Sequence, residues 1–381
     1  MPRMVDRIQR KVSALCRRYR IGWKSGVLLL ACVSAGLCVT SKASAAQEAA
    51  NRDNQALVLF QQGLSLADHG RLAQAELKLE QASARSPDDI EILTALAKVK
   101  ARLRELPAAL VIFRQVIAAA PNSSEAHLNL AIALADNSDL SGALDEATRA
   151  AELAPELPST HLNRARILAD LGRMDEARTE FATASRLAPA NPDSFYYWAL
   201  LERDSNNLGK ETELLSDVVR LQPRNEKALR LLADGLLSQG RRQESIAMWR
   251  RLLKINPNSR EAAYGLSRAL RTTDPQESMR MLQRFLALKQ RDDQLEHVKS
   301  LGNQAYVAMN TGQWSEAISC LIEAINQCGD CEVLADLHKD LGLALCHSGS
   351  IAEGKKELQI ALHLNPSDRD TLQALNAVSG R

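Results

Sequence analysis

The chain has 381 residues, with 48 Lys and Arg against 46 Asp and Glu, and a formal net charge of +2. Residues 1–45 hold nine of the basic residues and one acidic residue, so the rest carries 39 basic and 45 acidic residues, a net charge of −6. This balance gives no electrostatic basis for nucleic-acid binding. Aromatic residues make up only 4%, and Gly and Pro recur at regular intervals, which indicates internal repeats rather than separate globular domains.

Residues 1–46 have the pattern of an export signal. A basic stretch ending at Lys24 precedes an apolar run of 15 residues from Gly26 to Thr40, shorter than the roughly 20 residues that a spanning helix needs. Ala43 and Ala45 follow in the small-x-small arrangement that signal peptidase cleaves. We therefore expect a cleaved signal peptide and an exported protein, periplasmic or extracellular.

An uncleaved anchor is the alternative for this segment. Residues 21–40 are just long enough to cross a bilayer if Lys24 snorkels to the surface, which would attach the protein to the membrane. Residues 47–55, which follow, are polar at first and are expected to form a disordered leader.

From Ala56 the sequence repeats every 34 residues through six units without insertion. Position 8 of each unit is small: Gly63, Ala97, Ala131, Ala165, Ala199 and Ala233. Position 20 is small in all units but the fifth: Ala75, Ala109, Ala143, Ala177, Glu211 and Ser245. Position 32 is always proline: Pro87, Pro121, Pro155, Pro189, Pro223 and Pro257.

This spacing predicts two amphipathic helices in each unit. The small residues let the two helices approach closely, and the large residue at position 24, such as Phe181 or Trp249, fills the space between neighbouring units. Gly70, Gly172 and Gly240 at position 15 are expected to end the first helix in a left-handed conformation. The proline at position 32 ends the second helix.

The pattern resembles the tetratricopeptide repeat (TPR) family from residue 56 to about residue 368. The resemblance implies an all-α, right-handed superhelical solenoid of about nine helix-turn-helix repeats, which binds other proteins. Units one to seven cover residues 56–288, and units eight and nine cover residues 298–368. Residues 369–381 are expected to form a helix that caps the open end, followed by a short tail.

Between units seven and eight, residues 289–297 are expected to form a charged break followed by a helix extension. The break either divides the array into two rigid blocks or is a tolerated loop change within one solenoid. In unit seven, the turn between the helices is shortened to residues 272–275.

The sequence shows no catalytic or phosphate-binding motif, so we expect neither an enzyme nor a cofactor. His127, His161 and His338 share position 4 of their units. We expect them to be partly buried packing residues rather than metal ligands, and we predict no metal site.

Outside the signal, the cysteines gather near the C-terminal end, which favours disulfides in an exported chain. We expect a staple between units eight and nine that pairs Cys320 with Cys346 and Cys328 with Cys331, although four cysteines allow three connectivities. The alternatives are free thiols, or zinc bound by Cys328, Cys331, Cys346 and His347.

The TPR resemblance also implies that positions 2, 5, 6, 9, 12 and 13 face a concave groove. Position 6 is Asn129 and Asn163 in adjacent units, as in the TPR arrays whose asparagines hold the backbone of an extended peptide. Further groove candidates lie in the following units: Arg166, Tyr196, Tyr197, Arg203, Arg230, Tyr264 and Arg268. Tyr and Arg are common interface anchors. The alternative is that these are ordinary solvated residues.

We therefore expect a non-enzymatic scaffold that binds a protein or extended peptide in its groove. The alternative is a structural spacer or self-assembling envelope component that has no ligand groove.

Overall fold

The structure, a computed structural model, describes residues 54–379, which form 18 helices and no strand. The expected signal peptide and residues 47–53 of the expected leader lie outside this range. Residues 54 and 55 were expected to belong to the leader, but they already lie in the first helix, which spans residues 54–68.

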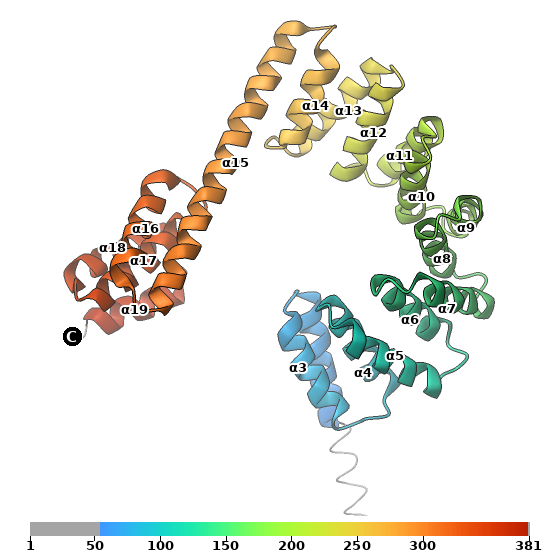
Figure 1. Cartoon of the computed structure of the whole chain (residues 1–381), viewed down its shortest axis with the longest axis horizontal. Helices are drawn as coiled ribbons and strands as arrows, with labels where there is room; N and C mark the ends of the chain where they lie inside the picture. Colours follow the sequence, from blue (N-terminus) through green and yellow to red (C-terminus); the bar gives the residue numbers. More distant parts are fainter. Residues whose placement is uncertain (1–53, 380–381) are drawn as a thin grey trace, which may run out of the picture. The chain divides into compact units, whose positions relative to one another are not determined.

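The chain forms two compact units, Met1–Tyr197 and Trp198–Arg381, whose boundary lies within α10 (Pro192–Asp204). In the first unit, the helix over residues 54–68 is followed by α3 (Leu72–Ser83), α4 (Ile90–Arg102), α5 (Leu106–Ala119), α6 (Ser124–Asp136), α7 (Leu140–Leu153), α8 (Pro158–Asp170) and α9 (Met174–Leu187) (Figure 1). The second unit contains α11 (Leu208–Leu221), α12 (Glu226–Ser238), α13 (Arg242–Ile255), α14 (Arg260–Leu270), α15 (Pro275–Asn310), α16 (Trp314–Cys328), α17 (Leu334–Ser348), α18 (Ile351–Leu364) and α19 (Arg369–Ser379).

The turn inside each repeat confirms the prediction for position 15. Gly70, Gly172 and Gly240 all have φ of 75°, the left-handed conformation that glycine adopts without strain. Three other units form the same turn with residues other than glycine, at φ between 55° and 67°: Arg104, Ser138 and Asn206. The repeat therefore imposes the turn even where the local residue disfavours it.

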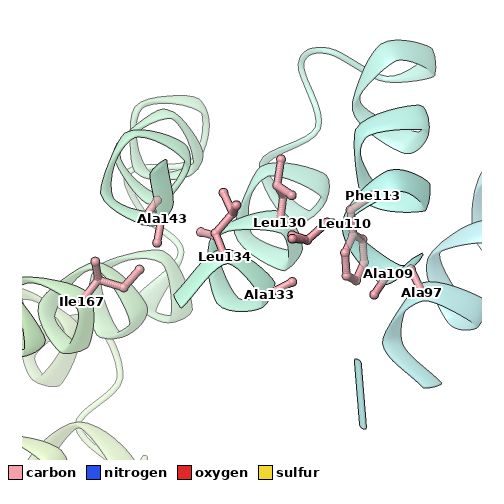
Figure 2. Close-up of a cluster of buried hydrophobic side chains, with 11 residues drawn as sticks. Ala97, Ala109, Leu110, Phe113, Leu130, Ala133, Leu134, Ala143 and Ile167 are labelled. Atoms are coloured by element: carbon pink, nitrogen blue, oxygen red, sulfur yellow. The ribbon is translucent and has the colours of Figure 1, made fainter. Parts of the chain in front are cut away.

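Small residues at positions 8 and 20 pack the two helices of a unit together, as predicted. Ala97 and Ala109 are fully buried, and Phe113 at position 24 is 2% exposed. In Figure 2, Phe113 of α5 belongs to one cluster with Leu130 and other buried side chains of α6, the first helix of the next unit. Burying such a side chain contributes about 1.5–3 kcal/mol, which links neighbouring units into a continuous core.

The contact between Trp249 and Gly265 shows how tightly position 24 fits against the next unit. Trp249 of α13 is 1% exposed, and a Cβ added to Gly265 of α14 would lie 2.4 Å from its indole ring. Only a glycine leaves room for the indole at this point of α14.

The predicted break at residues 289–297 is wrong, because α15 runs as one helix of 36 residues through this stretch (Figure 1). Lys289 to Asp293 include no Gly or Pro, and Lys, Gln and Arg are good helix formers, so charge alone does not end the helix. The second helix of unit seven thus continues directly into the first helix of unit eight. Despite this length, no helix within residues 54–379 is apolar enough over a sufficient span to cross a membrane.

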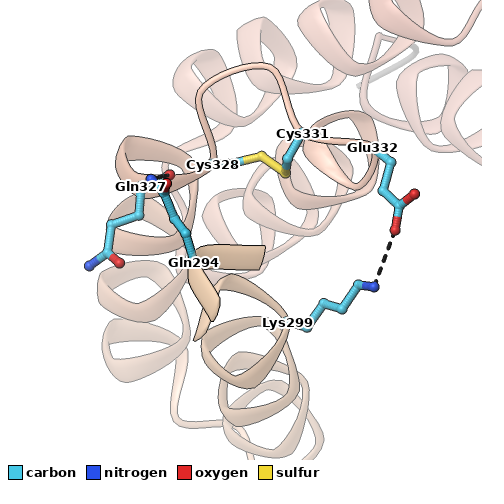
Figure 3. Close-up of a disulfide and its surroundings, with 6 residues drawn as sticks. All are labelled: Gln294, Lys299, Gln327, Cys328, Cys331 and Glu332. Atoms are coloured by element: carbon cyan, nitrogen blue, oxygen red, sulfur yellow. Dashed lines mark hydrogen bonds and ion pairs between the residues drawn. A yellow bond between two sulfur atoms is a disulfide. The ribbon is translucent and has the colours of Figure 1, made fainter. Parts of the chain in front are cut away.

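The structure forms one of the two expected disulfides. Cys328 and Cys331 are joined across the turn between α16 and α17, with Cα atoms 5.2 Å apart (Figure 3). The same turn is tied to α15, because Gln294 donates to the carbonyl of Gln327 at 2.6 Å and Lys299 pairs with Glu332 at 3.1 Å.

The expected Cys320–Cys346 bond is wrong, since both thiols are unpaired. The Cys346 sulfur lies only 2.5 Å from where a Cβ of Gly354 would be, so it faces α18 of its own repeat rather than α16. Burial raises the pKa of the Cys346 thiol.

Candidate binding groove

Two adjoining hollows lie over the first three repeats, and they are lined mainly by the helix over residues 54–68, α4 and α6. The first has a volume of about 500 Å³ and is lined at positions 5, 6, 9 and 13 by Phe60, Leu64, Thr94, Lys98, Arg102 and Asn129. The second, of about 630 Å³, shares Lys98, Arg102 and Asn129 and extends to Ile132 and Asp136. The positions that the resemblance assigns to a groove therefore line a depression in this part of the chain.

Capping side chains set where the lining helices begin. Asp89 precedes α4 and accepts hydrogen bonds from the backbone N–H groups of Glu91 and Ile92, at 2.9 and 3.2 Å. Ser123 precedes α6 and accepts from the N–H of Ala126 at 3.2 Å. Both caps satisfy backbone donors that a helix N-terminus leaves unpaired, which fixes the register of the groove positions.

Asn129 is the predicted groove residue that the structure places at the centre of these hollows. Its Nδ2 atom is buried and has no hydrogen-bond partner. Leaving a buried donor unpaired costs about 1–3 kcal/mol, which an acceptor supplied by a ligand would recover.

Charged side chains surround Asn129. Lys98 of α4 pairs with Glu125 of α6 at 3.0 Å, and the two side chains are 48% and 69% exposed. The hydrogen bond from Lys98 is the main cause of the lowered pKa of the Glu125 carboxyl, to which the Asn129 amide adds a weaker effect. Arg102 donates to the carbonyl of Ala67 at 3.1 Å. Because the Lys98–Glu125 pair is solvated, it contributes little to stability, and its partners are available to a ligand.

Asn163, Arg166 and Tyr197 are brought together, but they largely satisfy one another. The Asn163 amide donates to the Ser159 carbonyl at 2.8 Å and accepts from Arg166 at 3.3 Å. The Arg166 guanidinium lies 4.5 Å from the centre of the Tyr197 ring, and Tyr196 meets Tyr197 edge to face at 5.7 Å. The second asparagine thus differs from Asn129, because its polar atoms already have partners.

The remaining predicted groove residues lie in the second compact unit. Arg268 lies 5.9 Å from the centre of the Tyr264 ring and 3.7 Å from Asp234, and Tyr264 is 45% exposed. Arg230 is half-buried near Asp234, and Arg203 pairs with its neighbour Asp204 at 3.6 Å. These side chains form a separate group from the one around Asn129.

Two histidines form the same brace in adjacent repeats. His127 places Nδ1 2.6 Å from Glu146 and Nε2 3.0 Å from the carbonyl of Pro121. His161 repeats this arrangement with Glu180 at 2.7 Å and the Pro155 carbonyl at 2.8 Å. Each histidine therefore joins the second helix of its own unit to the turn that ends the preceding unit.

His338 pairs with Glu357 at 2.6 Å, so the prediction that the histidines are partly buried packing residues is confirmed. The sequence analysis overlooked the glutamate that follows each of the three histidines by 19 residues. Among residues 54–379, no group of three or more His, Cys, Asp or Glu side chains is placed to hold a metal ion.

Glu211 occupies the position that is small in the other units, and it is 3% exposed. Its Oε2 atom has no hydrogen-bond partner, and burial raises the pKa of the carboxyl. Gly235 on α12 helps to make room, since a Cβ there would lie 3.4 Å from Oε2.

Sequence reasoning missed the groove residues of the first two repeats: Phe60, Leu64, Thr94, Lys98 and Arg102. They occupy groove positions 5, 9 and 13, so applying the position rule to units one and two would have found them.

Consecutive helix pairs with a side-chain-lined groove define a helical-repeat protein. Two family models described as tetratricopeptide repeat match this chain, one over residues 66–131 and the other over residues 161–226 and 230–274. The chain is a member of the tetratricopeptide repeat family, and its repeats indicate a scaffold for protein–protein interaction.

Solved structures show the same fold at low sequence identity. PilW, described as a widely conserved type IV pilus biogenesis factor, is 18% identical with a TM-score of 0.50, over 54% of this chain and 96% of that one. Pseudomonas aeruginosa pilF is 20% identical with a TM-score of 0.47, over 56% of this chain and 96% of that one. No curated protein sequence gives a significant match.

Proposed function

We propose that the hollows over the first three repeats hold an extended segment of a partner protein. The observation that carries this proposal is the unpaired, buried Nδ2 of Asn129 at the centre of both hollows. A backbone carbonyl of the segment would accept a hydrogen bond from it. The contact requires a small adjustment of the side chains that cover the amide.

The surrounding side chains suit a segment of mixed character. Phe60 and Leu64 offer apolar surface, and Leu64 is 40% exposed. Lys98 and Arg102 offer cations for a carboxylate of the segment, once Lys98 leaves Glu125. An extended chain with alternating apolar and acidic residues meets both requirements. Arg166, Tyr196 and Tyr197 are proposed as further contacts for a longer segment.

We further propose that the protein is a non-enzymatic scaffold that acts after export from the cytoplasm, in the periplasm or outside the cell. The absence of a catalytic motif from the sequence supports the first part. The basic and apolar pattern of residues 1–46 supports the second.

The groove proposal is tested with peptides selected from a random display library against the full chain. Their affinity is then measured by fluorescence anisotropy for wild type and for Asn129→Ala, with Asn303→Ala as the matched control at an exposed position 6. We expect Asn129→Ala to weaken binding about tenfold, which corresponds to 1.4 kcal/mol, and the control to bind as wild type. Equal affinities for all three proteins would refute a role for Asn129.

A spacer without a ligand groove is the second candidate, and the uninterrupted α15 favours it. A helix of 36 residues spans about 54 Å at about 1.5 Å per residue. This function predicts that no displayed peptide binds to the groove and that inserting a flexible Gly-Ser linker at residue 290 abolishes activity in cells. Under the groove function, the same insertion leaves peptide affinity unchanged.

A further inference from the structure

The first half of α15 carries an apolar stripe that the structure leaves exposed. Met279, Leu282 and Leu286 are spaced by three and four residues, so they lie on one face of the helix. Met279 is 58% exposed, Leu286 is 54% exposed, and Leu282 is half-buried. We call these three residues the unit-seven end face.

Hydrogen bonding shows which repeat positions this face represents. Ser278 donates to the carbonyl of Ser267 at 2.8 Å, just as Ser245 at position 20 of unit six donates to the carbonyl of Ala233 at 2.7 Å. The shortened turn therefore shifts unit seven by one residue, and Ser278 takes the role of position 20. The end face then corresponds to positions 21, 24 and 28.

In the other repeats, position 24 is buried completely. Its residues are at most 2% exposed: Leu79, Phe113, Ala147, Phe181, Leu215, Trp249, Leu321 and Leu358. The next repeat covers this position with its first helix, whose residues at positions 3, 7 and 10 are small or apolar. In α6 these are Ala126, Leu130 and Ala133, and in α14 they are Ala262, Leu266 and Ala269. The unit-seven end face is thus an inter-repeat interface without its covering helix.

The first helix of unit eight has no side chains suited to this interface. At positions 3, 7 and 10 it presents Ser300, Gln304 and Val307, all of them exposed. Unit one, which begins the array, presents a similar exposed set: Val58, Gln62 and Ser65. Unit eight therefore begins a second array with a solvated outer face, and α15 leads into it without a turn (Figure 1).

The charges beside the end face indicate what kind of helix covers it. From residue 276 to 291 the basic residues are Arg280, Arg284, Lys289 and Arg291. The single acidic residue in this stretch, Glu277, already pairs with Arg250 at 2.6 Å. A second copy of the same face would bring like charges together, which disfavours self-association.

We propose that the unit-seven end face binds an amphipathic helix of a partner protein, with small or apolar residues at i, i+4 and i+7 and acidic residues beside them. The helix would continue the repeat stack in trans, on the interface that each preceding junction uses. This surface is separate from the groove residues around Asn129, so either proposal can fail without the other.

The test uses a synthetic helix of known sequence, a fluorescein-labelled peptide of residues 123–137. In the chain itself this segment presents Ala126, Leu130 and Ala133 to the preceding repeat and carries two acidic residues beside them, Glu125 and Asp136. Binding to the full chain is measured by anisotropy for wild type and Leu286→Glu. The control is Val307→Glu, on the same helix and 62% exposed.

We expect Leu286→Glu to weaken peptide binding at least tenfold and Val307→Glu to leave it unchanged. Arg280→Glu with Lys289→Glu should also weaken binding and reduce its salt dependence. Circular dichroism verifies that each variant keeps the helical content of wild type. No binding to wild type, or equal binding to wild type and Leu286→Glu, overturns the proposal. A dimer in analytical ultracentrifugation that Leu286→Glu dissociates also overturns it, in favour of a second copy of the chain.

Discussion

Gly265→Ala should destabilise the second compact unit, although alanine favours a helix more than glycine does. The added Cβ would lie 2.4 Å from two carbons of the Trp249 ring, whereas non-bonded carbons prefer about 3.5–4.0 Å. Trp249 is 1% exposed, so its ring has no free space into which to retreat by the ångström required. Overpacking of this kind costs about 1–3 kcal/mol, and helix propensity returns at most about 1 kcal/mol. We therefore expect a net loss of about 1–2 kcal/mol.

Urea unfolding followed by hydrogen exchange in α13 and α14 measures this effect locally, because long repeat arrays need not unfold in one step. Gly209→Ala is the matched control: it lies in a helix with no atom within 4 Å of the added Cβ, and it should be neutral or stabilising. In a Trp249→Leu background, Gly265→Ala should no longer destabilise. If Gly265→Ala is as stable as wild type in the native background, the packing of position 24 against the next repeat is wrong.

Three further predictions concern single features of the repeats. Ser138→Gly should stabilise the first unit by about 1 kcal/mol in thermal unfolding, because φ at Ser138 is 65°; a loss of stability would contradict the strain argument. Alanine substitutions of His161 and Glu180 should show a coupling of about 1–2 kcal/mol in a double-mutant cycle, and additive effects would show that the brace contributes nothing. Glu211→Gln should stabilise the second unit at pH 7 more than at pH 4. Burial raises the pKa of Glu211 above 4.5, so the cost of its charge is absent when both states are protonated and grows as the pH rises towards the folded-state pKa. Equal gains at both pH values in urea unfolding would exclude this cause.

The 34-residue period predicted most of the fold because each conserved feature of a unit has one structural role. The glycine at position 15 and the proline at position 32 determine where helices end, and their spacing is visible in the sequence. The course of α15 was mispredicted because the charged residues 289–293 were interpreted as a break. The better signal was the missing proline at the end of unit seven, together with the polar Ser300 and Gln304 in the next helix.

The candidate site was predicted less completely, because residue type does not show whether a polar atom already has a partner. Asn129 and Asn163 share position 6, yet Asn163 donates to Ser159 within its own helix while the Asn129 amide donor is unpaired. The thiol pairing failed for a related reason. Counting residues along two helices estimates height but not facing, and Cys346 faces Gly354.

Site-specific photocrosslinking in cells tests the groove proposal most directly. A photoreactive phenylalanine analogue replaces Lys98 in the groove of the full chain, and the control replaces Gln115, an exposed residue of α5 that lines neither hollow. The groove function predicts that position 98 captures a partner protein, that position 115 does not, and that adding Asn129→Ala reduces the capture. Capture from position 115 but not from position 98 would contradict it.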